Sequence, residues 1–125
     1  MSIAKWVGAT AATALLALGA ACSRTEASFV RDVNPILKEY CVECHSTGGR
    51  GYVASGFSVE SYDDVMRGTK FGPVIVPGSS VSSTLERLIE HKADPSIAMP
   101  QGKPRLPKEN LDIIRTWIDE GAKNN

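Results

Sequence analysis

The chain lacks three features, and each absence excludes a common class of protein. Its 14 lysines and arginines balance its 14 aspartates and glutamates, so it is not a strongly basic nucleic-acid binder. It has three cysteines, too few for a second pair that would complete a four-ligand zinc site. Its longest uncharged run falls short of the roughly 20 apolar residues of a membrane-spanning helix. With 42% apolar residues, the chain reads as one globular domain.

Much of the apolar content lies in the first 22 residues. Lys5 precedes an uncharged run, Trp6–Ala21, and the next charge is Arg24. A basic start, an apolar stretch and small residues before a cleavage point are typical of a secretory signal peptide. We therefore predict a signal peptide at residues 1–21, a linker at 22–28 and the folded domain at 29–125. A retained membrane anchor is the alternative.

Cys22 ends the apolar run in Leu18-Gly19-Ala20-Ala21-Cys22, which resembles the lipobox of bacterial lipoproteins. That resemblance implies an acylated Cys22 at the mature N-terminus and attachment to a membrane. Lipoboxes usually carry leucine where this chain has Gly19, so ordinary cleavage after Ala20 or Ala21 competes with it. The expected location is the periplasm, or a membrane surface that faces the periplasm or the cell exterior.

The other two cysteines lie in Cys41-Val42-Glu43-Cys44-His45. In an exported protein such a pair could form a disulfide, and Cys-x-x-Cys alone could be a redox pair. The following histidine favours covalent attachment of a c-type haem, in which two thiols bind the porphyrin and the imidazole ligates the iron. Residues three apart share a helix face, so both thiols would point to the same porphyrin edge.

The apolar spacing beyond the leader predicts short helices and no strands. Apolar residues three and four apart run from Phe29 to Cys44, with Asn34 as N-cap of a helix over 35–45 after a short turn. Further helices are predicted from Ser61 to Met66, from Ser83 to about His91 and over 108–121. Ser83 and Glu86 would cap the second of these, whose apolar face is Val81, Leu85, Leu88 and Ile89; the apolar face of the third is Leu111, Ile114, Trp117 and Ile118. Glycines predict a loop over 46–57, and prolines predict another over 92–107. The fold class is therefore all-α, with three or four short helices.

A haem iron with one histidine ligand leaves its sixth position open to a second residue. The candidates are Met66, Met99 and His91. Met99 is favoured because it lies in a proline-rich loop that could pass across the haem, whereas a methionine on a helix, such as Met66, is usually core filler. His91 is expected to be a solvated residue at a helix end. Thioether ligation opposite imidazole raises the reduction potential, which suits an electron carrier.

Taken together, these residues resemble the monohaem class I cytochrome c family, and within it the planctomycete-type cytochrome c domains. The resemblance rests on the Cys41-to-His45 motif, on Met99-Pro100 and on three further segments: Phe29–Leu37, Val76-Pro77-Gly78 with Ser83 and Leu85, and Trp117–Ala122. It implies terminal helices that cross beside one covalently bound haem, with Trp117 and Gly121 near the crossing. Val74–Val76, Ile36, Leu37 and Leu106 are candidates for the apolar haem wall, or for ordinary core.

The implied activity is one-electron transfer between redox partner proteins, without a catalytic residue. His45 and Met99 would be the axial ligands, and neither nucleic acid nor enzymatic turnover is expected. Three alternatives stay open: a haem peroxidase, a ligand sensor with an open sixth position, and an accessory subunit of a larger membrane redox complex. The oligomeric state, the donor and the acceptor are not indicated by the sequence.

Overall fold

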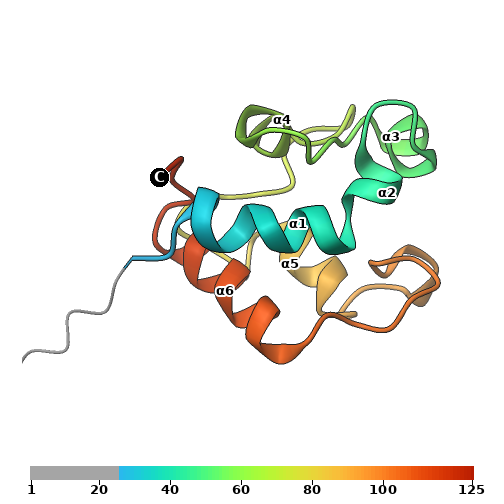
Figure 1. Ribbon diagram of the computed structural model, residues 1–125. Coiled ribbons are helices and arrows are strands. Elements are labelled where there is room, and N and C mark those ends of the chain that lie inside the picture. The colour runs from blue at the N-terminus through green and yellow to red at the C-terminus, as the bar shows by residue number, and fades with distance from the viewer. Residues whose placement is uncertain (1–25) are drawn as a thin grey trace, which may run out of the picture.

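The computed structural model describes residues 26–125, which form an all-helical fold (Figure 1). The predicted signal peptide and Cys22 lie outside these residues. The helical elements in chain order are η1 (Phe29–Val33), α1 (Asn34–Tyr40), α2 (Val42–His45), α3 (Arg50–Ser55), α4 (Tyr62–Arg67), α5 (Thr84–Ile89), η2 (Pro95–Ile97) and α6 (Lys108–Asp119). Between residues 26 and 125 the only extended pairing is an isolated bridge, Thr69 with Gly72. The all-α prediction is confirmed, although with six α-helices instead of three or four.

The helix predicted over 35–45 is broken in the structure. The turn before it is the π-helical η1, whose N-cap Ser28 accepts a hydrogen bond from the Arg31 amide. Because η1 runs directly into α1, Asn34 is the first residue of α1 and not its N-cap, so that prediction is wrong. Cys41, with a φ of −120°, separates α1 from α2. The motif therefore has a short helix of its own, set apart from the helix that packs on the core.

Residues 46–57 also differ from the sequence prediction, because they contain the helix α3. The glycines at its two ends explain why a glycine-rich stretch can be helical. Gly49 is the extended N-cap, and Gly56 ends the helix in the left-handed region with a φ of +76°, which glycine adopts at little cost. The predicted loop is therefore wrong at its centre, and α3 contacts the motif helix α2.

The predicted start of α4 is confirmed, and that of α5 is confirmed in position only. Ser61 accepts a hydrogen bond from the Asp64 amide at 3.1 Å, as an N-cap should. Ser83 does precede α5, but its hydroxyl donates to the Ser79 carbonyl at 2.8 Å and does not cap the helix. Val81, which was expected on the buried face of α5, lies in the preceding loop and is 85% exposed.

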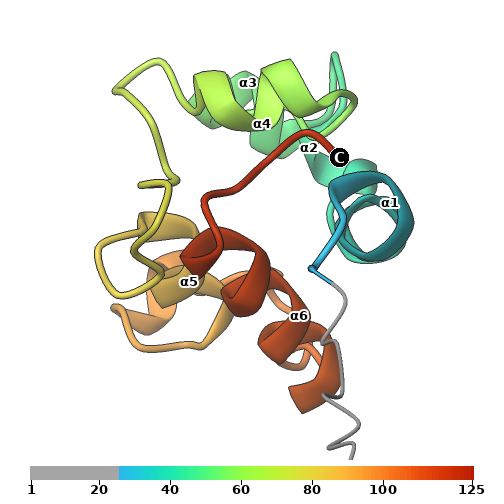
Figure 2. The ribbon, with the colours of Figure 1, turned by 90° about the vertical axis from the view of Figure 1, so that its left-hand side faces the viewer.

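The core lies where η1 and α1 meet the C-terminal helix α6 (Figure 2). Trp117 is 1% exposed, and its ring lies 5.5 Å from that of Phe29 and 6.4 Å from that of Tyr62, centroid to centroid. The apolar face predicted for α6 is buried as expected: Leu111, Ile114, Trp117 and Ile118. Most residues proposed for a haem wall belong to the same core, namely Ile36, Leu37, Val74, Ile75 and Leu106. Val76 is the exception, because it is exposed.

Hydrogen bonds join the two ends of the described chain. The Ser28 hydroxyl donates to the Asn125 carbonyl at 2.6 Å, and the amides of Phe29 and Val30 donate to the side chain and the carbonyl of Asn125, both at 3.0 Å. Figure 1 shows both ends on one side of the molecule and the helices α2 and α3 on the opposite side.

A buried ion-pair cluster joins α5 to α6. Arg115 donates from Nε to Glu86 Oε1 at 3.0 Å and also pairs with Glu90. The Glu86 side chain is only 5% exposed, and among the described residues its Oε2 has no hydrogen-bond partner. Burial therefore outweighs the attraction of Arg115 and raises the pKa of Glu86 above its ordinary value.

We expect Glu86→Gln to flatten the pH dependence of stability. A carboxyl whose pKa is raised on folding contributes stability below its unfolded pKa of about 4.3, and this contribution is lost as the pH rises through the folded pKa. The free energy of unfolding, measured in denaturant between pH 4 and 7, should show that loss in the wild type but not in Glu86→Gln. The exposed Glu109→Gln on α6 is the control and should follow the wild type. Parallel pH profiles for wild type and Glu86→Gln would contradict the prediction.

Candidate functional site

One helical turn carries both thiols and the imidazole of the motif. The amides of Cys44 and His45 both donate to the Cys41 carbonyl, at 3.2 and 2.9 Å. All three side chains are half-buried, and both cysteines are free. The break at Cys41 therefore gives the three groups a common rigid frame at the end of the molecule away from the termini (Figure 1).

The state of the two thiols argues against a redox-active pair. Burial, and to a lesser extent the nearby Cys44, raises the pKa of Cys41 to about 11. A redox-active Cys-x-x-Cys depends on a lowered thiol pKa, because the thiolate is the nucleophile. Cys44 accepts a hydrogen bond from Arg50 Nε at 3.3 Å, between Nε and Sγ. The pair thus consists of one half-buried thiol whose raised pKa favours the protonated form and one thiol beside a guanidinium.

The His45 ring is oriented by a backbone group of the segment after α3. Its Nδ1 lies 3.1 Å from the Phe57 carbonyl oxygen, and a carbonyl can only accept, so Nδ1 carries the proton. The ring also packs edge-on against the Phe57 ring, with 5.3 Å between centroids. A histidine ligand to a metal typically donates its other N–H in this way, which fixes the tautomer. Nε2 is left with its lone pair available.

Gly51 of α3 packs its backbone close against this edge of the ring. A Cβ atom at position 51 would lie 2.9 Å from His45 Nε2, 2.7 Å from His45 Cε1 and 2.9 Å from the Cys44 carbonyl oxygen. Such contacts are too close for a side chain, so only glycine fits here without displacing the imidazole. Two free thiols and an imidazole with an oriented Nε2 form a donor set that fits a covalently attached haem.

Met99 lies in the proline-rich loop after α5, where it is half-buried and packed against the core. Its main chain is held at two points: its amide donates to the Leu88 carbonyl at 3.1 Å, and its carbonyl lies 3.0 Å from His91 Nε2. A hollow of about 230 Å³ opens in the same loop, lined by His91, Ala93, Pro95, Ala98, Pro100, Gly102 and Lys103. Met66 also packs partly buried against the core, from α4.

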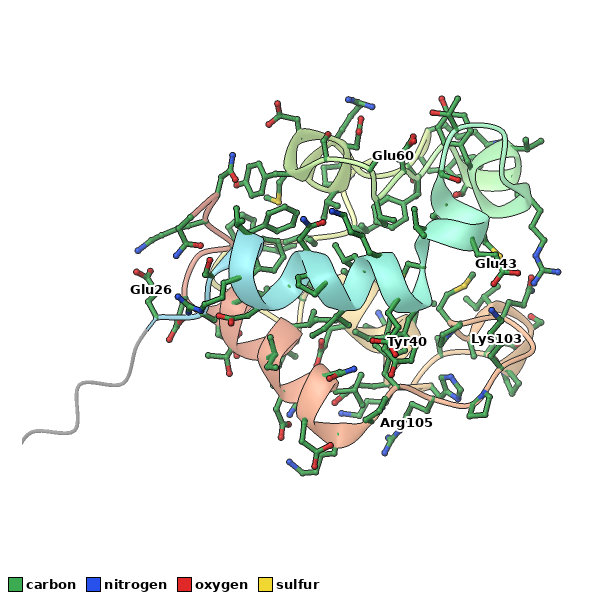
Figure 3. The ribbon with its side chains drawn as sticks, viewed as in Figure 1. Glu26, Tyr40, Glu43, Glu60, Lys103 and Arg105 are labelled. Atoms are coloured by element: carbon green, nitrogen blue, oxygen red, sulfur yellow. The ribbon has the colours of Figure 1, made fainter. Side chains whose placement is uncertain are left out.

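An ion pair joins the Met99 loop to the motif helix. Lys103 Nζ lies 2.5 Å from Glu43 Oε2, and Figure 3 shows the two side chains meeting between α2 and the loop. Lys103 lowers the pKa of Glu43 through this contact. Both side chains are largely exposed, so the pair stabilises little. The contact shows that the Met99 loop lies next to the turn that bears the two thiols and His45.

Three features of this region were not predicted from the sequence. The first is the contact of His45 with the Phe57 carbonyl, which is a backbone group and so leaves no signal in the sequence. Gly51 was assigned to a flexible loop, although its place six residues after His45 in a glycine-rich stretch was visible. His91 was expected to be solvated; it is exposed, but its ring is bonded to Met99. The predicted ligation of iron by His45 and Met99 and the acylation of Cys22 remain predictions.

Residues 26–125 hold neither a cluster of metal-ligating side chains nor a membrane-spanning helix. No group of three or more histidines, cysteines, aspartates or glutamates in this part of the chain is arranged to hold a metal ion. No helix within the same residues has the length and apolar character needed to cross a membrane.

Comparison with known proteins supports the assignment made from the motif. Residues 41–102, from Cys41 to just beyond Met99, match the family model described as Planctomycete cytochrome C. Neither the curated proteins nor the solved structures contain a significant match to the chain. The matched segment holds the Cys-x-x-Cys-His motif, α3 to α5 and the Met99 loop, and the structure around it is all-helical. Residues 41–102 therefore belong to a cytochrome c-type family, whose role is haem binding and electron transfer.

Proposed function

We propose that this protein is a one-electron carrier that holds a single haem c through Cys41 and Cys44, with His45 and Met99 as axial ligands. The observation that carries the proposal is the combination at His45. Its Nδ1 donates to the Phe57 carbonyl, which leaves Nε2 with its lone pair, one turn from two free thiols. When bound, haem supplies one-electron chemistry between ferric and ferrous iron.

The chain's own residues would orient and shelter that group. The Phe57 carbonyl holds the His45 ring in one tautomer, and the Met99 loop lies beside α2, where Lys103 meets Glu43. The thioether of Met99 would raise the reduction potential, as expected of a carrier. His91, the only other histidine, donates to the Met99 carbonyl, an arrangement that favours the carrier over a peroxidase or sensor with a free distal histidine.

The proposed setting is the periplasm or a membrane surface facing it, with redox proteins as partners. The support for export lies in the leader sequence and in the chemistry of the motif. Cys22 would provide the lipid anchor in the lipoprotein version of this proposal. An accessory subunit of a larger redox complex would use the same haem site, and co-purification with that complex would distinguish it from a free carrier.

Mass spectrometry of the purified, denatured protein tests the proposal. The full-length gene is expressed in a bacterial host that matures c-type cytochromes, and the expected mass is that of the processed chain plus one haem. The Cys41→Ala/Cys44→Ala variant is the control and should carry no covalent haem. The same spectrum reports the cleavage point and any acyl groups on Cys22. A wild-type mass without haem would overturn the proposal.

A further inference from the structure

His91 occupies a backbone conformation that the ends of helices usually give to glycine. It lies just past α5 with a φ of +56°, in the left-handed region. The Lys92 amide donates to the Arg87 carbonyl at 2.9 Å, and the His91 amide donates to the Leu88 carbonyl at 3.2 Å. This pair of bonds defines a Schellman motif, in which the left-handed residue is most often glycine. A histidine here is strained, and the turn itself gains nothing from its side chain.

The side chain has a partner eight residues along the chain. His91 Nε2 lies 3.0 Å from the Met99 carbonyl oxygen, and because a carbonyl only accepts, the imidazole is the donor. The Leu88 carbonyl, which closes the turn, also accepts from the Met99 amide at 3.1 Å. The end of α5 therefore holds both the N–H and the C=O of Met99, one through the main chain and the other through the imidazole.

We propose that His91 is a positioning residue, which fixes the main chain of Met99 so that its thioether is presented to the iron without further ordering of the loop. The inference rests on the proposed function, because it assumes that Met99 is the sixth ligand. Strain at a residue is retained where the surrounding structure makes use of it, and here the left-handed backbone directs the imidazole to the Met99 carbonyl. The hydrogen bond is exposed, so its effect is modest.

Competition by added imidazole at the sixth position of the ferric protein tests this role. In His91→Asn, whose side chain suits the left-handed region but is too short to reach Met99, imidazole should bind about two- to tenfold more tightly than in the wild type, the ratio expected from one hydrogen bond. Amide hydrogen exchange at Met99 should accelerate by a similar factor. His91→Gln, which restores a donor of longer reach, should recover part of both effects. His91→Gly relieves the strain, so it should melt no lower than the wild type while still showing the tighter binding.

The Met99→Ala variant separates this inference from the proposed function. It should bind imidazole more tightly than every His91 variant, because no competing ligand remains. If Met99→Ala does so while His91→Asn and His91→Gly match the wild type, the positioning role is wrong and ligation by Met99 stands. If Met99→Ala binds imidazole no more tightly than the wild type, Met99 is not the ligand, and both proposals are overturned.

Discussion

Met99→Ala is expected to lower the reduction potential by a few tenths of a volt. Axial ligands shift the potential of haem proteins over a span of about 0.8 V in all, so the expected change is a fraction of that span. A thioether opposite imidazole stabilises ferrous iron, so its loss favours the ferric state. The far-red absorption band from methionine-to-iron charge transfer should disappear in the ferric protein. Optical redox titration measures both quantities on one sample.

Met66→Ala is the matched control for this prediction. Both methionines are half-buried and pack against the core, so truncation removes a similar side chain from a similar environment. Met66→Ala should lose stability, because a methionine-to-alanine change in a core costs about 2–5 kcal/mol and less where the site is half-buried. Its potential and far-red band should match the wild type. An unchanged potential in Met99→Ala would show that its thioether is core filler as well.

Trp117→Ala should cost about 3–5 kcal/mol of the free energy of unfolding, the usual loss for removing a buried tryptophan. Trp117 is 1% exposed and packs against the rings of both Phe29 and Tyr62. Its Nε1 also donates to the Lys123 carbonyl at 2.8 Å, so the substitution leaves that carbonyl without its partner. Domains of this size are stable by roughly 5–15 kcal/mol, so a large part of the total stability would be lost.

Phe71→Ala provides the control for the loss of an aromatic ring as such. Phe71 is 83% exposed, and a surface substitution of this kind usually changes stability by no more than about 0.5 kcal/mol. Trp117→Phe should fall between the two, because it keeps an aromatic side chain against Phe29 and gives up the hydrogen bond to Lys123. Denaturant unfolding of the haem-loaded protein measures all three. Similar losses for Trp117→Ala and Phe71→Ala would contradict the packing described here.

Local patterns predicted the helices that bury an apolar stripe and the motif that carries the chemistry. The spacing of Leu111, Ile114, Trp117 and Ile118 is that of an amphipathic helix, and α6 buries all four. Ser61 and Asp64 form a capping-box pattern, which predicts the start of α4 without any knowledge of the fold. The Cys-x-x-Cys-His motif is equally local, and the family match begins at its first residue.

The features that the sequence did not reveal depend on glycine caps and side-chain contacts that leave no periodic pattern. The helix α3 forms where glycine content predicted a loop, because Gly49 and Gly56 serve as its caps. Glu86 was expected to help start α5, yet it is buried against Arg115, 29 residues further on. His91 and Met99 lie in segments that look solvated when each is considered alone. Glu86 and Arg115 share no short stretch of sequence, and the proline-rich loop that follows His91 and holds Met99 carries no periodic pattern that would indicate their contact.

The hydrogen bonds of Asn125 with Ser28 and Val30 keep both ends of the described chain at one end of the domain. The chain enters the fold at Glu26, at the end of the molecule opposite α2 and α3 (Figure 1). A tether ahead of Glu26, as proposed for an acylated Cys22, would therefore join the domain at the end opposite the motif. The turn with Cys41, Cys44 and His45 would then lie at the end remote from the point of attachment, accessible to a soluble partner.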